Sequence, residues 1–275
     1  MNISLSLKSL AVALIAGLIL GVILAHFLST RNEGGVQVGV LKQVEWVHGE
    51  NDEPMASVIL LCSAWNLTNS PLQLELEARL SGWTGKESIG ILQPHQLRSV
   101  QFSLLLPPGS YSGLVRVSGE RENFITFNLD LQLPRIPEGR EKMIFVTPGC
   151  PEVKRLVAEL DGGENLLEIY REWISTHLSY VPDNEAYRQP DYWQLPRETL
   201  QLGRGDCEDF ALLLCSMLRA SGYPAERVFV AICRKGEAKH VLVLLDNKLI
   251  EPYLPFGEAV GYEIEEVFND IYPPA

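Results

Sequence analysis

One cysteine in this chain lies where a catalytic nucleophile would be expected. Residues 203–211 read Gly-Arg-Gly-Asp-Cys-Glu-Asp-Phe-Ala, a glycine-containing loop that runs into an apolar-periodic helix. Asp206 can serve as the N-cap of that helix, which makes Cys207 its first residue. Only the thiolate of a cysteine is nucleophilic, and the dipole and unpaired N–H groups of a helix start favour the anion. Glu208 and Asp209 suit the same helix start but oppose ionisation of the thiol, so a partner imidazolium would be needed.

A histidine and a carboxylate follow in an order that could supply this partner. His240 begins the apolar strand predicted for residues 240–245, where a polar ring can face a cleft. A two-residue turn at Asp246-Asn247 folds the next strand back and makes Glu251 the diagonal neighbour of His240 on one face. Asp246 is the rival acid, but six strand residues separate it from the imidazole by roughly 20 Å. We therefore predict a Cys207–His240–Glu251 triad of nucleophile, base and orienting acid.

These residues stand in a context that resembles a known family. The run Gly-Asp-Cys-Glu-Asp-Phe-Ala-Leu-Leu-Leu, a helix that ends in Ser-Gly-Tyr-Pro-Ala, His240 and the Glu251-Pro pair are similar to the transglutaminase-like (papain-like) superfamily, in particular to the microbial transglutaminase-like cysteine proteinases. The resemblance covers about residues 150–260. It implies Cys207 as the nucleophile, His240 as general base and acid, and the carboxylate at 251 as the orienting group. Related sequences usually carry Asp before that proline, so Glu251 lengthens this arm by one methylene.

The resemblance extends to residues 191–199, upstream of the cysteine. Their sequence is Asp-Tyr-Trp-Gln-Leu-Pro-Arg-Glu-Thr. Trp193 and Gln194 are the candidate donors of an oxyanion hole there, together with the backbone N–H of Cys207.

The resemblance also raises the question of a metal ion. Some relatives bind calcium through acids around the cysteine, and Asp206, Glu208 and Asp209 match those positions. Three carboxylates alone do not make a calcium site. We therefore expect no required cofactor, with Ca²⁺ at these three acids as a candidate.

The elements that must hold these groups form an α+β domain predicted for residues 146–275. A three-to-four-residue apolar period indicates helices, and β-rich apolar runs indicate strands of an antiparallel sheet after them. The predicted helices are 152–160, 164–178 and 210–218, and the predicted strands are 228–233, 240–245 and 249–251.

Residues 38–134 have a different pattern, which predicts an all-β immunoglobulin-like sandwich. About seven short apolar runs are separated by turn residues, and Leu72 to Leu80 alternates with period two. Residues 29–37 and 135–145 are predicted linkers because they are rich in polar residues, proline and glycine. Asn66-Leu67-Thr68 matches the acceptor pattern for N-glycosylation.

The N-terminus predicts a membrane anchor. Residues 10–28 are apolar, alanine or glycine except for one histidine, and as a helix they would span about the thickness of a bilayer core. Positive charge before this run puts residues 1–9 in the cytoplasm and the C-terminal domains outside it, as in a single-pass membrane protein. A cleaved signal peptide is the alternative.

Composition excludes other classes of function. The 275-residue chain has a formal net charge of −12, which argues against binding to nucleic acid phosphates. Its five cysteines are too few and too scattered for a disulfide scaffold, and they form no CxxC pair for structural zinc.

The sequence therefore predicts an α+β fold class with three parts: an N-terminal transmembrane helix, an immunoglobulin-like sandwich and a transglutaminase-like domain. We expect an anchored cysteine protease or amidase that acts on protein or peptide amides. A cross-linking transglutaminase is the first alternative, since an amine can replace water. A non-catalytic surface binding protein with a decayed triad is the second.

Overall fold

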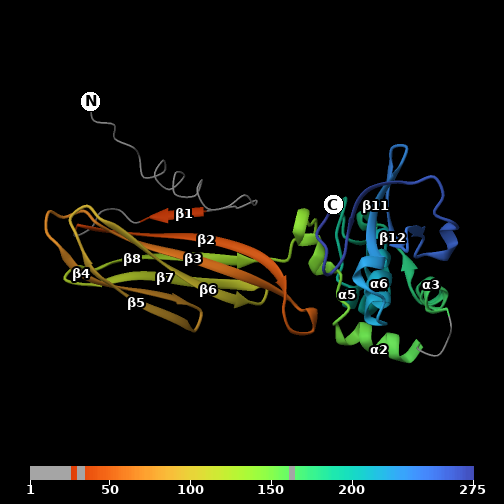
Figure 1. Ribbon diagram of the computed structural model, residues 1–275, viewed down its shortest axis with the longest axis horizontal. Helices are drawn as coiled ribbons and strands as arrows, with labels where there is room; N and C mark the ends of the chain where they lie inside the picture. Colours follow the sequence, from red (N-terminus) through yellow and green to blue (C-terminus); the bar gives the residue numbers. More distant parts are fainter. Residues whose placement is uncertain (1–25, 30–34, 161–164) are drawn as a thin grey trace. The chain divides into compact units, whose positions relative to one another are not determined.

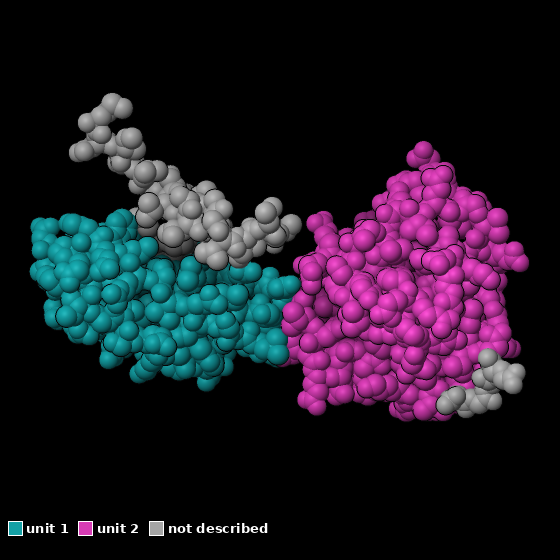
Figure 2. Space-filling view, in the orientation of Figure 1, with its two compact units in different colours: residues 1–45, 56–132 teal, residues 46–55, 133–275 magenta. Residues whose placement is uncertain are grey.

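The computed structural model describes residues 26–29, 35–160 and 165–275. The chain divides into two compact units, which Figure 2 distinguishes by colour. The first consists of residues 1–45 and 56–132, and the second of residues 46–55 and 133–275. Each unit is described by itself below.

Eight strands of the described residues form two four-stranded sheets (Figure 1). One sheet has the order β1-β2-β3-β6, with the strands His26–Ser29, Val36–His48, Pro54–Asn66 and Leu97–Leu106. The other has the order β5-β4-β7-β8, with the strands Trp83–Leu92, Leu72–Leu80, Gly109–Gly119 and Asn123–Leu131.

Alternating side chains bury one face of each sheet. In β3 every second residue from Ala56 to Ala64 has no exposed surface, and in β4 Leu72, Leu74 and Leu76 are buried between exposed polar residues. Side chains of a strand alternate between its two faces, so this burial defines the core of a sandwich. The period of two predicted for Leu72 to Leu80 is present in the structure.

The prediction of a transmembrane helix at residues 10–28 is wrong in this structure, and the predicted single-pass membrane localisation loses its support. Residues 26–28 belong to strand β1, which pairs antiparallel with β2 through His26 opposite Lys42 and Ser29 opposite Gly39. Within the described ranges, no helix is both long enough and apolar enough to cross a bilayer. Residues 10–25 lie outside the described part of the chain. The structure describes a β-rich fold with a few helices. The predicted fold class is therefore corrected by removing its N-terminal transmembrane helix.

Asn66, the asparagine of the Asn-Leu-Thr glycosylation pattern, is a structural residue of the sandwich. Its side chain has no exposed surface, and its amide donates to the carbonyls of Ser70 at 2.8 Å, Leu92 at 2.9 Å and Gln93 at 3.2 Å. Its Oδ1 accepts from the backbone N–H and the hydroxyl of Thr68 at 2.9 and 2.7 Å. A glycan on this nitrogen is incompatible with these contacts.

The second unit combines helices with a mixed set of short strands. Its α-helices are α2 (Pro151–Leu160), α3 (Leu166–His177), α4 (Asp183–Ala186), α5 (Pro196–Leu202) and α6 (Cys207–Ala220). Its four-stranded antiparallel sheet has the order β13-β12-β11-β14, with the strands Lys248–Ile250, Ala238–Leu245, Val228–Lys235 and Glu263–Phe268. A two-stranded parallel sheet joins β9 (Ser179–Tyr180) to β10 (Arg204–Gly205).

Helix α6 is the centre of this unit (Figure 1). All residues from Glu208 to Leu218 are buried, because α2, α3 and α5 cover some of its sides and β11 and β12 pack on another. A helix that is apolar nearly all round is stable only when it is enclosed in this way. The N-terminus of α6 is therefore held rigidly, and so are the backbone positions of Cys207 and Glu208 in its first turn.

We predict that Asn66→Ala destabilises the first unit by about 2–4 kcal/mol, because it leaves buried carbonyl and N–H groups without partners. Urea unfolding of the purified protein, followed by intrinsic fluorescence, measures this loss. The matched control is Asn69→Ala at an exposed position of the same turn, for which a change of less than about 0.5 kcal/mol is expected. Equal effects of the two substitutions would contradict the role assigned to Asn66.

Candidate active site

The loop before Cys207 is shaped by two glycines. Gly203 ends α5 with a φ of 64°, a left-handed conformation that glycine adopts without steric cost. At Gly205 a Cβ atom would lie 2.7 Å from the Cβ of Asp209, so a larger residue would push the two segments apart. Between them, Arg204–Gly205 pairs with Ser179–Tyr180. Helix α6 then begins at Cys207 with Asp206 as its N-cap, as predicted.

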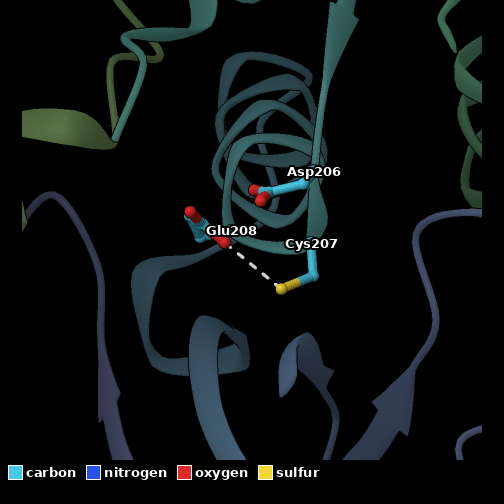
Figure 3. Close-up of side chains that lie close together, drawn as sticks. All are labelled: Asp206, Cys207 and Glu208. Atoms are coloured by element: carbon cyan, nitrogen blue, oxygen red, sulfur yellow. Dashed lines mark hydrogen bonds between the residues drawn. The ribbon is translucent and has the colours of Figure 1, made fainter. Parts of the chain in front are cut away.

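The thiol of Cys207 faces an acid rather than open solvent. Cys207 is partly buried, and its Sγ donates to Oε2 of Glu208 at 3.2 Å (Figure 3). Burial raises the pKa of this thiol well above its ordinary value, and the negative charges of Glu208 and Asp206 raise it further. A backbone hydrogen bond from Val241 lowers the pKa in opposition. The sulfur therefore lies beside the residue that follows His240.

His240 and Glu251 form the hydrogen-bonded pair predicted for them. The distance from Nε2 of His240 to Oε2 of Glu251 is 2.7 Å, and the carboxylate is 5% exposed. The other oxygen of Glu251 accepts from the backbone N–H of Tyr253 at 3.2 Å, and its carbonyl accepts from Nε of Arg171 at 2.8 Å. The longer arm of glutamate thus reaches the ring. Because Nε2 is bound by the acid, Nδ1 is the nitrogen left to exchange a proton with a thiol.

The hairpin that brings these two residues together has the predicted register. Leu245 lies opposite Lys248, and both turn residues have positive φ, 49° at Asp246 and 63° at Asn247. Such a turn matches the twist of two antiparallel strands. Asp246, the rejected rival, is instead bound to the exposed guanidinium of Arg227 with two contacts of 2.5 Å.

A cluster of carboxylates surrounds the start of α6. Within the described residues, the groups Asp183-Asp191-Glu208, Asp183-Asp206-Asp209 and Asp206-Cys207-Glu208 each have ligand atoms that all lie within 4.8 Å of one another. No one of these groups contains all three acids predicted as calcium ligands, Asp206, Glu208 and Asp209. Asp183 and Asp191 are additional carboxylates of the cluster.

Burial of these carboxyl groups opposes their ionisation. Burial raises the pKa of Asp183 to about 6, and it raises the pKa of Glu208 and Asp209 well above their ordinary values, with further increases from neighbouring carboxylates. Oδ1 of Asp183 and Oδ1 of Asp206 are buried and accept no hydrogen bond. Protons or a cation can supply the missing positive charge. An all-oxygen, anionic donor set of this kind fits Ca²⁺, which prefers six to eight oxygen ligands.

The two predicted oxyanion donors have buried side chains. Trp193 is 5% exposed and stacks on Phe268 at 5.9 Å between ring centroids. Burial raises the pKa of Asp191, and a hydrogen bond from the Trp193 side chain opposes this rise. Gln194 is 1% exposed, its backbone N–H donates to Asp209 at 2.8 Å, and its Oε1 has no partner. The backbone N–H of Cys207 lies in the first turn of α6, where it has no partner within the helix. Their part in an oxyanion hole stays a prediction.

Sequence reasoning did not identify several residues of this site. Asp183 at the start of α4 and Asp191 in the loop after it lie beside the first turn of α6. Arg171 reaches Glu251 from α3. The position of Asp183 directly after Pro182, at the start of the short helix α4, was the available signal for one of them.

We predict that the Cys207 thiol alkylates slowly near neutral pH when divalent cations are removed, because its raised pKa leaves little thiolate. The rate of iodoacetamide modification as a function of pH gives the apparent pKa, and Cys207→Ala supplies the blank, since the other four cysteines are buried. Glu208→Gln removes a carboxyl group that raises the pKa of this thiol, and should therefore lower that pKa. Glu237→Gln makes the same substitution at an exposed position and should leave the pKa of the Cys207 thiol unaltered. If it shifted this pKa as much as Glu208→Gln does, the effect assigned to Glu208 would be contradicted.

Comparisons with known proteins place this site in a family. A model of the transglutaminase-like superfamily matches residues 154–249, which include Cys207 and His240. Dynein regulatory complex subunit 7 of Xenopus tropicalis is 33% identical to this chain over 95 residues, which are 34% of this chain and 10% of that protein. The chain therefore spans only about a tenth of the length of this curated relative.

Similarities to solved structures are weaker. The exo-chitosanase CsxA of Amycolatopsis orientalis is 14% identical, with a TM-score of 0.32 over 40% of this chain and 14% of that one. A protein from Archaeoglobus fulgidus is 13% identical, with a TM-score of 0.20 over 34% of this chain and 97% of that one. Neither score is high enough to define a shared fold. The family model does identify the region: residues 154–249 are a domain of the transglutaminase-like superfamily.

Proposed function

We propose that this chain is a cysteine acyl-transfer enzyme that hydrolyses protein or peptide amides. Cys207 is the nucleophile, His240 is the general base and acid, and Glu251 orients the imidazole. The observation that carries this proposal is the 2.7 Å hydrogen bond between His240 and Glu251, next to a thiol that contacts the backbone of Val241. A thiol, an imidazole and an orienting carboxylate in this order are the components of covalent acyl transfer.

The reaction divides into two steps. Nδ1 of His240 takes the proton of Cys207, and the thiolate attacks the amide carbonyl to form a carbon–sulfur bond. The carbon–nitrogen bond then breaks, and the imidazolium gives its proton to the leaving amine. Water, activated by the same imidazole, attacks the thioester and returns the thiol with release of a carboxylic acid. An acceptor amine in place of water would make the same chain a cross-linking enzyme.

Glu251 acts on these steps only through His240. Its hydrogen bond to Nε2 fixes which ring nitrogen faces the thiol and stabilises the imidazolium that forms in each step. The contacts of Glu251 with Tyr253 and Arg171 keep the acid in place. The lone pair of Nδ1 then keeps one direction, which lowers the cost of orienting the base for each proton transfer.

A non-catalytic binding protein is the second candidate, and the thiol itself favours it. Cys207 donates its proton toward Glu208, and its pKa is raised rather than lowered. A protein that had lost catalysis would have no need for a thiolate. Formation of a covalent thioester separates the two candidates, because only the enzyme forms it.

We predict that the wild-type protein forms an acyl-enzyme on Cys207 and hydrolyses amides in a peptide library, whereas Cys207→Ala does neither. Intact-protein mass spectrometry detects the adduct, and peptide mass spectrometry detects the products. Glu251→Gln keeps the size of the side chain but weakens the stabilisation of the imidazolium, and should lower kcat about a hundredfold. Glu237→Gln is the control for the loss of one acid. Hydrolysis that persists in Cys207→Ala would overturn the assignment of the nucleophile.

Calcium binding at the acid cluster is part of the proposal. Asp183, Asp206 and Asp209 would hold the ion, whose bound charge would offset the repulsion among the buried carboxylates. We predict that Ca²⁺ raises the Tm of EGTA-treated protein and that Asp183→Asn abolishes most of this increase. Glu185→Gln, an exposed change on the same short helix α4, is the control and should respond like the wild type. Calorimetric titration with CaCl2 measures the same difference, and an unchanged Tm would argue that protons neutralise the cluster.

A further inference from the structure

Four aromatic side chains gather beside His240, and the acid–base chemistry uses none of them. The ring of Tyr262 lies 5.4 Å from the imidazole, and that of Phe256 lies 6.1 Å from it, measured between centroids. Phe256 in turn contacts Tyr180 at 4.8 Å and Tyr253 at 5.3 Å. We call Tyr180, Tyr253, Phe256 and Tyr262 the aromatic rim.

Phe256 is the member of the rim that is exposed to water. Its side chain is 48% exposed, and that of Leu254 on the same turn is 37% exposed. The other three rings are only partly exposed, and Nζ of Lys235 lies 5.2 Å from the centroid of Tyr262. An exposed phenylalanine within a group of packed rings is an unused apolar contact surface.

The turn that carries Phe256 is held in place by hydrogen bonds. Its backbone N–H donates to the carbonyl of Tyr253 at 3.0 Å, and the N–H of Leu254 donates to the hydroxyl of Ser175 in α3 at 2.8 Å. Tyr253 is also tied to Glu251. The aromatic rim and the orienting acid therefore belong to one short segment, so the ring of Phe256 has a defined position relative to the imidazole.

The geometry of the proposed reaction determines which part of a substrate lies near Phe256. The imidazolium must come within hydrogen-bonding distance of the leaving amine to give up its proton. The side chain of the residue that supplies this amine begins only two bonds away, and it can therefore span the 5–6 Å between the imidazole and the rim. The acyl part lies instead over the thiol, where Asp206 and Glu208 make the surroundings acidic.

We propose that the aromatic rim binds the side chain of the residue immediately after the scissile amide, and that this residue is aromatic or large aliphatic. This inference rests on the proposed amide hydrolysis and names its substrate class. Phe256 supplies the open wall of the subsite. An apolar side chain there removes exposed ring surface from water, whereas glycine leaves that surface exposed.

A digest of a peptide library tests this subsite. Wild type, Phe256→Ala and Phe256→Leu are incubated with peptides derived from a proteome, and mass spectrometry identifies the residue after each cleaved bond. We expect Phe, Tyr, Leu and Met to be enriched for the wild type, and the ratio of kcat/KM for a Phe peptide over its Gly analogue to fall about tenfold in Phe256→Ala. Phe256→Leu should keep the preference for aliphatic residues. Phe124→Ala, at a phenylalanine 55% exposed in the first unit, is the matched control and should leave the ratio unchanged.

The outcomes separate this inference from the proposed function. Cleavage without a preference after the scissile bond, or a preference that Phe256→Ala does not alter, overturns the subsite and leaves the hydrolase standing. A preference confined to the residue before the scissile bond also overturns it, because the rim would then bind the acyl part. No Cys207-dependent cleavage in any condition, with or without Ca²⁺, overturns the proposed function and the subsite together.

Discussion

The burial of several carboxylates around the first turn of α6 is the constraint on which this site depends. A buried carboxylate without a partner is costly, and carboxylates close to one another repel. Backbone N–H groups offset part of this cost by donating hydrogen bonds to the carboxylates. The N–H of Gln194 donates to Asp209, and the N–H of Tyr192 donates to Asp183. The N–H of Asp183 donates in turn to the carboxylate of Asp206. The loop from residue 181 to residue 195 therefore follows a course set by its donors. The acids and the loop stabilise each other.

The same turn determines where the thiol can react. Helix α6 is enclosed along its length, so its first residue cannot move independently of the core. On the other side, β12 pairs with β11 and β13 in a continuous register, with Cys233 opposite His240. Two rigid elements thus bring a sulfur and an imidazole into one region. Precision of this kind, from a helix end and a strand end, is what catalysis by a positioned nucleophile requires.

Local patterns in the sequence predicted the parts of the site that depend on neighbours along the chain. The N-cap at Asp206 and the two-residue turn at Asp246-Asn247 are determined by residue type over a few positions, and the structure has both. The register of β12 with β13 puts Ile250 opposite Val243, so the turn predicts that Glu251, directly after β13, lies near His240. The hydrogen bond of 2.7 Å is the result of that geometry.

Features that depend on distant segments could not be predicted in this way. Asp183 meets Asp206 only because β9 pairs with β10, and two short strands leave almost no periodic signal. Phe256 reaches the imidazole through a turn anchored on α3, which no local pattern indicates. At residues 10–28 a local pattern predicted an element that the described part of the chain does not have. Hydropathy reports how apolar a segment is but not whether it pairs with a strand, and His26–Ser29 pairs with β2. Asn66 is a similar case, because a glycosylation pattern does not report that an amide is buried.

Two opposing influences act on the sulfur of Cys207, and their balance decides what the protein can do. The helix N-terminus and the N–H of Val241 favour the thiolate, while burial and the charges of Glu208 and Asp206 favour the thiol. Burial is the largest of these influences, so the site holds a protonated sulfur, and any charge on the acids adds to this effect. Positive charge at the acid cluster would shift the balance without moving any atom of the Cys207, His240 and Glu251 side chains. Because the acids are adjacent to the nucleophile in sequence, every factor that neutralises them is also a factor that controls the reactivity of the thiol.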